Sequence, residues 1–244
     1  MTDRQILRLS GADTRSFLQG LITNDINGVD KGIVYAAMLT PQGKLVADFF
    51  LSAYDNDILL DVASNLADTL IKRLALYKLR ANVDVRRTDL TVQRGIGDIP
   101  FGAWPDPRHP DLGWRGYGLA LDAAAEPDWD AIRVTHCIPE SGIELTPDTF
   151  ILEARFEALS GVDFRKGCYV GQEVTARMKH RTELRKGLRR VRITGSAVSG
   201  TEITANGKPA GTLHTRSGDM AIAYLRLDRA RGPMMAGGAA VELL

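Results

Sequence analysis

Residues 33–51 read IVYAAMLTPQGKLVADFFL, and this stretch decides how the first part of the chain folds. Two apolar runs, Ile33–Leu39 and Leu45–Leu51, flank the turn sequence Pro41–Lys44. Short runs rich in β-branched and aromatic residues on either side of a Pro and Gly turn are typical of an antiparallel hairpin. The sequence therefore predicts two paired strands, with Asp48 on the second.

The segments around this hairpin predict the rest of one layer. Ser10 has the character of a helix N-cap and Gly20 of a helix stop. Ile58–Val62 is a third strand candidate, and Ser64 begins a helix whose apolar residues recur at helical spacing as far as Tyr77. Two further short strands are expected, Asn82–Arg86 and Leu90–Gln93. This order favours an α+β layer, with helices on one face of an antiparallel sheet.

The remainder of the chain changes character twice. Gly97–Gly118 is rich in Pro and Gly and is interpreted as an irregular connector. Helices are predicted over Trp129–Cys137 and Thr149–Leu159. From about Gly187 onward, short β-type runs separated by turn signals such as Asn206-Gly207 predict a small β-barrel or sandwich. These runs are Leu188–Ile193, Glu202–Thr204, Gly211–His214, Ala221–Leu225 and Ala239–Leu243.

Composition narrows the class of protein. The chain has 244 residues, 44% hydrophobic and 25% charged, with a net charge of +1, which is typical of a globular protein and argues against a general nucleic-acid binder. No apolar run approaches the roughly 18 residues of a membrane span. The N-terminal residues lack the pattern of a secretory signal, and the two cysteines form neither a disulfide framework nor a CxxC pair. We therefore expect a cytoplasmic protein and predict no metal site.

The octapeptide at residues 166–173, KGCYVGQE, carries the most chemical information. It places Cys168 beside Lys166 and Arg165, and a neighbouring positive charge favours the thiolate over the thiol. Gly167 and Gly171 allow backbone conformations or close approaches that a side chain would block. The alternative is a tight turn with a buried cysteine. The second cysteine, Cys137, is interpreted as an ordinary buried helix residue.

Four stretches in series resemble the YgfZ family, tetrahydrofolate-binding proteins related to the glycine-cleavage T-protein and required for maturing or repairing some iron–sulfur enzymes. They are the octapeptide, residues 17–26 (FLQGLITNDI), residues 40–44 (TPQGK) with Asp48 after them, and residues 77–80 (YKLR). The resemblance spans nearly the whole chain. It implies a three-lobed T-protein-like fold, with a folate-binding-type α+β domain at 1–95, a second α+β domain carrying the octapeptide at 96–186, and a β-barrel at 187–244.

The resemblance also assigns candidate roles. Cys168, Lys166 and Asp48 are the candidate catalytic residues. T-proteins carry a pair of acids where this chain has only Asp48, which weakens the case for aminomethyl transfer. The candidate ligands of tetrahydrofolate, or of a one-carbon derivative, are Asn24, Asp25, Arg80, Tyr169, Gln172, Glu173 and Arg177.

Five of the candidate ligands have a simpler structural interpretation. Glu173 and Gln172 offer hydrogen bonds suited to the edge of a pterin, but Glu173 and Arg177 could instead form a salt bridge on a helix surface. Asn24 and Asp25 are typical turn residues, and Arg80 could complement the end of a helix. These alternatives stay open.

The stretch Arg177–Arg192 contains eight Lys or Arg residues and a single acid, Glu183. A solvated basic surface is the simpler interpretation, and an anion site for a carboxylate tail or an acidic partner is the sharper one.

Three functions compete at this point, and the sequence leaves open whether the chain is an enzyme. The first, which we favour, is a folate-dependent accessory factor whose partners are iron–sulfur enzymes or assembly proteins. Because clusters normally need about four ligands, Cys168 alone could make only a shared or transient cluster contact. The second is a one-carbon transferase or demethylase of the aminomethyltransferase type, which needs Asp48 but not Cys168. The third is a non-enzymatic module that docks a protein or RNA through the basic stretch.

Overall fold

The computed structural model describes residues 3–121, 126–180 and 183–244, which form two compact units. Unit 1 contains residues 1–127 together with 156–176, and unit 2 contains residues 128–155 together with 177–244. The octapeptide, residues 166–173, therefore belongs to the same unit as the N-terminal residues. The predicted boundaries at 1–95, 96–186 and 187–244 stay a prediction.

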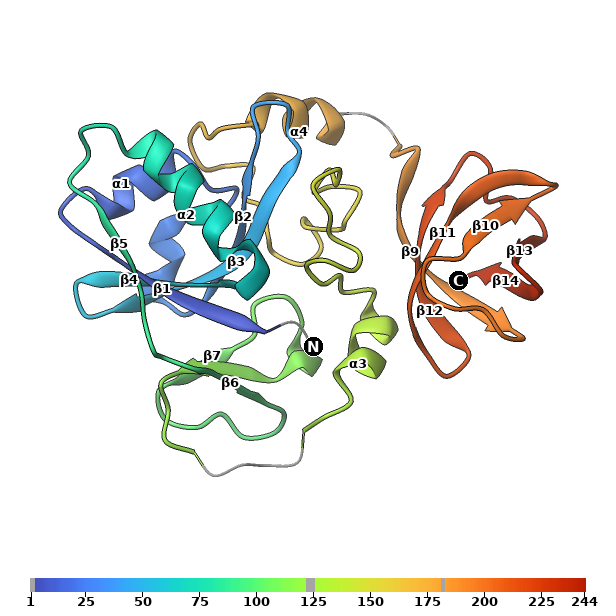
Figure 1. The fold of residues 1–244 in the computed structure, drawn as a ribbon, viewed down its shortest axis with the longest axis horizontal. Helices are drawn as coiled ribbons and strands as arrows, with labels where there is room; N and C mark the ends of the chain where they lie inside the picture. The colour runs from blue at the N-terminus through green and yellow to red at the C-terminus, as the bar shows by residue number, and fades with distance from the viewer. Residues whose placement is uncertain (1–2, 122–125, 181–182) are drawn as a thin grey trace. The chain divides into compact units, whose positions relative to one another are not determined.

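The described residues of unit 1 form an antiparallel sheet in the order β2-β3-β4-β1-β5 (Figure 1). The predicted hairpin is confirmed, because β2 and β3 pair with Ala37 opposite Asp48. The prediction missed β1, a polar-looking segment that pairs with both β4 and β5. The strands are β1 (Arg4–Ser10), β2 (Val34–Leu39), β3 (Leu45–Tyr54), β4 (Asp57–Ala63) and β5 (Asp84–Arg87).

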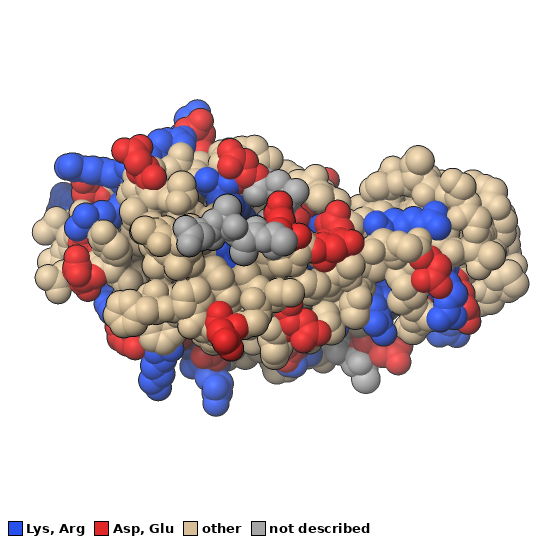
Figure 2. All heavy atoms as spheres, turned by 90° about the horizontal axis from the view of Figure 1, so that it is seen from below, with Lys and Arg blue, Asp and Glu red and all other residues tan. Residues whose placement is uncertain are grey.

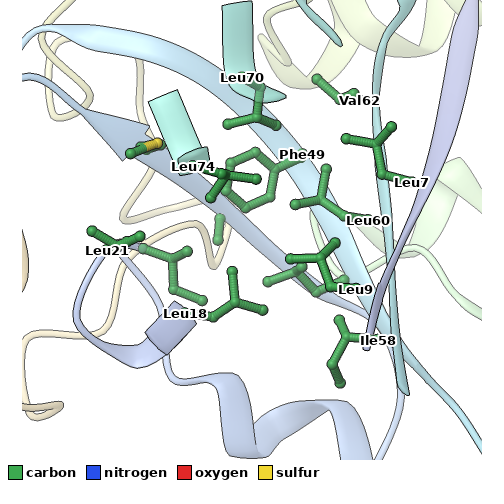
Figure 3. Packing of buried hydrophobic residues seen from close by; sticks show 14 of the residues in the cluster. Leu7, Leu9, Leu18, Leu21, Phe49, Ile58, Leu60, Val62, Leu70 and Leu74 are labelled. Atoms are coloured by element: carbon green, nitrogen blue, oxygen red, sulfur yellow. The ribbon is translucent and has the colours of Figure 1, made fainter. Parts of the chain in front are cut away.

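Helices cover one face of this sheet, as predicted. The N-cap of helix α1 (Thr14–Gln19) is Asp13, three residues after the expected Ser10, because Ser10 still belongs to β1. The C-cap is Gly20. Helix α2 (Ser64–Lys78) follows β4 directly, and a short 3-10 helix spans Ile26–Asp30. Figure 3 shows Leu70 and Leu74 of α2 packed among sheet side chains such as Phe49 and Leu60. Each such buried side chain contributes about 1.5–3 kcal/mol, so this cluster holds the layer together.

The opposite face of the sheet is partly polar, because side chains alternate along each strand. Tyr35, Asp48, Phe50 and Asp61 lie on this face, and all four are buried. A second, three-stranded sheet supplies partners to it through Arg115 and Tyr117. Its order is β6-β8-β7, with β6 (Val92–Gly95), β7 (Ala103–Pro105) and β8 (Trp114–Tyr117).

The interpretation of Gly97–Gly118 as an irregular connector is therefore wrong. It contains β7, β8 and a 3-10 helix at Pro110–Leu112. These strands are only three and four residues long, so they lack the alternating pattern from which a strand is recognised.

The predicted helix at Thr149–Leu159 is also wrong, because these residues form consecutive turns. Arg155 has a φ of 65° and Ser160 a φ of 53°, which a right-handed helix does not allow. Its apolar residues are nevertheless buried, as expected, with Phe156 fully covered and stacked on Tyr35 at a centroid distance of 5.0 Å. The spacing of apolar residues indicated burial correctly but not the backbone that achieves it.

Unit 2 confirms the predicted β-barrel. Its described strands close in the order β10-β11-β12-β9-β14-β13, and a tight turn at Asn206-Gly207, both with positive φ, joins β10 to β11. The strands are β9 (Lys186–Thr194), β10 (Glu202–Ala205), β11 (Lys208–Ser217), β12 (Met220–Arg226), β13 (Met234–Ala236) and β14 (Ala239–Leu243). The helix predicted at Trp129–Cys137 is present as α3 (Trp129–His136), which packs on the barrel. Its Arg133 forms an ion pair with buried Glu144, and Glu144 accepts hydrogen bonds from Thr215 of β11.

The last two residues of the octapeptide begin helix α4 (Gln172–Lys179), and the residues before them form a loop. Among the described residues, no helix is both long and apolar enough to cross a membrane. Figure 2 shows basic and acidic side chains scattered among uncharged ones on the visible face.

Candidate functional site

The octapeptide forms a loop that is tied to unit 1 on both sides of Cys168. Before the cysteine, the Asp163 amide donates to the carbonyl of Thr23. After it, the Val170 amide donates to the carbonyl of Gly20, which follows α1. Cys168 itself is exposed, so the alternative of a buried cysteine in a tight turn is wrong. Cys137 is buried as predicted, and burial raises the pKa of its thiol.

Lys166 has backbone partners in the structure, and its predicted catalytic role stays a prediction. Its side chain is buried, and its Nζ donates to the backbone oxygens of Gln19 and Ile22, each at 2.6 Å. The ammonium also lies 4.9 Å from the centre of the Tyr169 ring. Burial lowers the pKa of Lys166 to about 8, although the negative charges of Asp25 and Asp163 act to raise it. The lysine therefore binds the end of α1.

The glycines of two separate sequence motifs contact each other. Gly171 has a φ of +85°, and a Cβ there would lie 2.5 Å from the Thr40 oxygen and 2.8 Å from the Leu39 Cβ. Gly43, in the β2–β3 turn, has a φ of +77°, and a Cβ there would lie 2.8 Å from the Cβ of Val174. Both positions require glycine for the loop to seat against the turn. Gly167 has open space around it, so the approach beside Cys168 is not obstructed there.

Four predicted folate ligands gather around this loop. The Gln172 Oε1 accepts the backbone N–H of Tyr169 at 3.1 Å, at the start of α4. Asn24 donates to the carbonyls of Tyr35 and Ser160, and Asp25 caps the 3-10 helix after it. The turn chemistry expected of Asn24 and Asp25 is thus present, and their ligand roles stay predictions.

Three predicted ligands lie at the surface. Glu173 and Arg177 are exposed on α4. Arg80 is exposed in the turn after α2, and the contacts that gather the other candidates do not include it.

Asp48 lies on the polar face of the large sheet, where the Tyr35 hydroxyl donates to its Oδ2 at 3.0 Å. Burial and the charge of Asp48 raise the pKa of Tyr35 well above its ordinary value. The Asp48 carboxylate is buried, and its predicted catalytic role stays a prediction.

The same face carries a buried ionic cluster that sequence reasoning missed. Asp61 accepts from Arg4 Nε and from Arg115 Nη1, each at 2.6 Å, and from the Tyr117 hydroxyl at 3.2 Å. Burial raises the pKa of the Asp61 carboxyl, but the charges of Arg4 and Arg115 lower it below the ordinary range. The Arg115 guanidinium carbon lies 3.8 Å from the Phe50 ring centroid. Removing one partner of such a buried network would leave an uncompensated charge, so its members depend on one another.

Asp106 joins this cluster through Arg115, whose Nη2 lies 3.5 Å from its Oδ2. Asp106 also accepts bidentate bonds from Arg108 Nε and Nη2, at 3.0 and 2.8 Å. Although burial raises the pKa of Asp106, the charge and hydrogen bonds of Arg108 lower it to about 2. The sequence holds one hint of the cluster, because Asp61 lies inside the apolar strand β4 as Asp48 lies inside β3. It does not identify the partners of Asp61.

The basic stretch Arg177–Arg192 is partly engaged within unit 2. Arg190 donates to the carbonyl of Thr135, and Arg192 lies 3.3 Å from Glu242. Residues 181–182 of this stretch lie outside the described residues. The described part shows both solvated and bonded side chains, so the anion-site interpretation stays a prediction.

Comparisons with known proteins confirm the fold. The family model described as the C-terminal β-barrel domain of CAF17 matches residues 185–244, which are the barrel strands. The solved structure of the glycine cleavage system aminomethyltransferase T from Bartonella henselae covers 99% of this chain with a TM-score of 0.79, and the chain spans 82% of that protein. At 12% identity this likeness shows the fold alone, and it confirms the α+β, T-protein-like class with its terminal barrel.

Curated relatives carry the name iron–sulfur cluster assembly factor IBA57, mitochondrial, or its homolog. The Mus musculus protein is 30% identical over 95% of this chain, which spans 78% of it, and the Homo sapiens protein is 29% identical with the same coverage. The Mycosarcoma maydis homolog is 33% identical over 75% of this chain. The chain spans only about half the length of that fungal relative, 54%.

Two predictions change with these relatives. The cytoplasmic localisation is wrong, because the matched proteins are named mitochondrial, which points to the mitochondrion. The YgfZ assignment is not confirmed in its specific form, since these relatives carry the IBA57 name. From the extent and identity of the mouse match, the chain belongs to the IBA57 family.

Proposed function

We propose that the chain is an accessory factor in the assembly or repair of iron–sulfur proteins and that Cys168 is its reactive group. The relatives' names supply the process. The observation that carries the chemical part is the exposure of Cys168 on a loop fixed to unit 1 on both sides. A thiol that is accessible and held in place can exchange a ligand with a partner, whereas a buried thiol cannot.

The cluster itself is the cargo of this function. One cysteine supplies one of the roughly four ligands that a cluster needs, so the remaining ligands come from the partner. The proposed partners are therefore iron–sulfur enzymes or assembly proteins that present an incomplete ligand set.

We further propose that the chain binds tetrahydrofolate or a one-carbon derivative of it. The side chains at the start of α4 fit the chemistry of such a ligand. The Gln172 amide is oriented by its bond to the Tyr169 backbone, and the Glu173 carboxylate is exposed one residue later. An amide and a carboxylate match the donors and acceptors at the edge of a pterin ring. Bound folate would supply one-carbon chemistry beside the loop.

The test of the thiol uses cells that lack the chain and depend on it for the activity of an iron–sulfur enzyme. Cys168→Ser is expected to abolish rescue, because it is a near-isosteric change that removes only the sulfur atom. Cys137→Ala is the matched control, since it removes a buried thiol at a position where alanine keeps the same backbone strain. Full rescue by Cys168→Ser would contradict the proposed role.

The accessibility of the thiol can be measured directly in the folded protein. A maleimide reagent is expected to label Cys168 within the time in which Cys137 stays unlabelled, because only the first is exposed. Equal labelling of the two cysteines by intact-protein and peptide mass spectrometry would contradict this difference.

The folate proposal is tested by anaerobic calorimetric titration with tetrahydrofolate. Glu173→Gln is expected to weaken binding about tenfold or more, since it removes a charge-assisted acceptor. Glu202→Gln, an exposed change in the barrel, serves as the control. Unchanged tetrahydrofolate binding in Glu173→Gln would contradict the assignment of this residue to the folate site. Formation of methylene-tetrahydrofolate from glycine, sarcosine or dimethylglycine would instead favour the transferase alternative.

A further inference from the structure

The ammonium of Lys166 donates hydrogen bonds to two backbone oxygens. Its two short bonds reach Gln19 O and Ile22 O, the carbonyls at and just beyond the end of α1. The last carbonyls of a helix have no partner within the helix and need one from elsewhere. A lysine at this end also complements the negative end of the helix dipole. The side chain therefore completes α1 with a group that comes from 147 residues after Gln19 in the chain.

This bond ties the cysteine loop to α1 two residues before Cys168. The loop is held again two residues after it, where the Val170 amide binds the carbonyl of Gly20. Beyond that, Gly171 seats against Thr40 with no room for a side chain. The exposed thiol thus lies between two anchors that both use the segment after α1.

The charge environment agrees with an anchoring role. The carboxylates whose charges act on Lys166 are Asp25 and Asp163, both of which flank the same anchor. The ring of Tyr169 faces the ammonium at 4.9 Å on the remaining described side. The ammonium thus contacts two carbonyl oxygens and an aromatic ring, and the charges of two carboxylates favour it, which is consistent with a structural clamp.

We propose that Lys166 is a positioning residue that fixes the Cys168 loop by binding the carbonyls at the end of α1, and that it does not serve the thiol as a charged neighbour. This inference rests on the proposed function of Cys168 and explains why the motif has a lysine two positions before its cysteine. It replaces the simpler idea that the lysine stabilises a thiolate directly.

The test compares purified Lys166→Met with the wild type in two measurements. Hydrogen exchange by mass spectrometry should show amides of residues 163–170 exchanging about tenfold faster or more, while the core amides of β2 to β4 keep their rates. The pH profile of Cys168 alkylation should keep its midpoint. Lys72→Met, which removes an exposed lysine of α2 in the same unit, should change neither measurement.

Either of two results would overturn the inference. One is unchanged exchange of the loop in Lys166→Met. The other is a shift of the alkylation midpoint to higher pH, which is what the loss of a charged neighbour predicts. Should Lys166→Met fail to fold, Lys166→Gln provides the second variant, because it removes the charge but keeps amide donors. Because the glutamine amide can still donate to the carbonyls, the alkylation midpoint alone decides in Lys166→Gln: an unchanged midpoint supports the positioning role, and a shift to higher pH overturns it.

The conservative variant Lys166→Arg adds a functional readout. It keeps donors that can reach the carbonyls, so it should restore slow loop exchange and iron–sulfur enzyme activity together, and activity without loop protection would count against positioning. Failure of the proposed function would look different, since it would appear as an active Cys168→Ser variant with the exchange results unaffected.

Discussion

Replacing Asp61 by asparagine tests whether the buried ionic cluster holds unit 1 together. The Asp61 side chain is fully buried and accepts hydrogen bonds from Arg4, Arg115 and Tyr117. Asparagine keeps the shape but removes the charge and turns an NH₂ group toward a guanidinium. Breaking a buried pair leaves an uncompensated charge and lowers the free energy of unfolding by about 3–5 kcal/mol. Because two guanidiniums lose their carboxylate, we expect a value within or above this range.

The matched control is Asp30→Asn, which breaks a bidentate pair with Arg15 that is exposed on both sides. Exposed pairs contribute only about 0–1 kcal/mol, so this variant should lie close to the wild type. Urea unfolding followed by far-UV circular dichroism measures both variants, and the m-value should not change. A loss below about 1 kcal/mol in Asp61→Asn, or equal losses in the two variants, would refute the reasoning.

Three further outcomes follow from the described contacts. Asp106, whose pKa is lowered to about 2, stabilises the fold above the ordinary carboxyl pKa, so about 2 kcal/mol should be lost as the pH falls from about 4 to 2, and urea titrations of Asp106→Asn should lack this loss. Gly171→Ala should destabilise the fold by about 1–3 kcal/mol more than Gly200→Ala in thermal and urea unfolding, because both glycines have positive φ but only Gly171 lacks space. Glu144→Gln should lower the unfolding free energy of the barrel unit by about 1–3 kcal/mol, since Arg133 loses its buried carboxylate partner but keeps Asp130 at 2.8 Å and Glu140 at 3.1 Å, and an unchanged urea midpoint would contradict this.

The sequence correctly predicted those helices and strands whose position depends mainly on neighbouring residues. The β2–β3 hairpin and α2 have clear periodicity, a turn sequence and adequate length, and the structure places them within a few residues of the prediction. Strand β1 was missed because the charged residues Arg4 and Arg8 make the segment look polar. Its Leu7 and Leu9 are nevertheless buried, because β1 pairs with the distant strands β4 and β5. Such pairing is a tertiary effect that no window of neighbouring residues contains.

The candidate site divides in the same way. The octapeptide could be recognised from the sequence because it combines a cysteine, a lysine and two glycines at close spacing. The structure agrees with this, because Cys168 is exposed and Gly171 has no space for a side chain. The ionic cluster could not be predicted, because Arg115 reaches Asp61 across 54 positions of sequence. Likewise the sequence placed Lys166 two positions before the thiol, but it could not show the bonds from the Lys166 Nζ to the distant carbonyls at the end of α1.

The discontinuity of unit 1 has a consequence for how the chain matures on the ribosome. Its sheet is synthesised early, yet residues 156–176 are translated only after the whole segment 128–155. Until then Tyr35 lacks its stacking partner Phe156, and the carbonyls at the end of α1 lack Lys166. A nascent chain released before residue 176 would thus present an unfinished N-terminal unit to chaperones and proteases, and the segment bearing the thiol is among the last pieces to lock it.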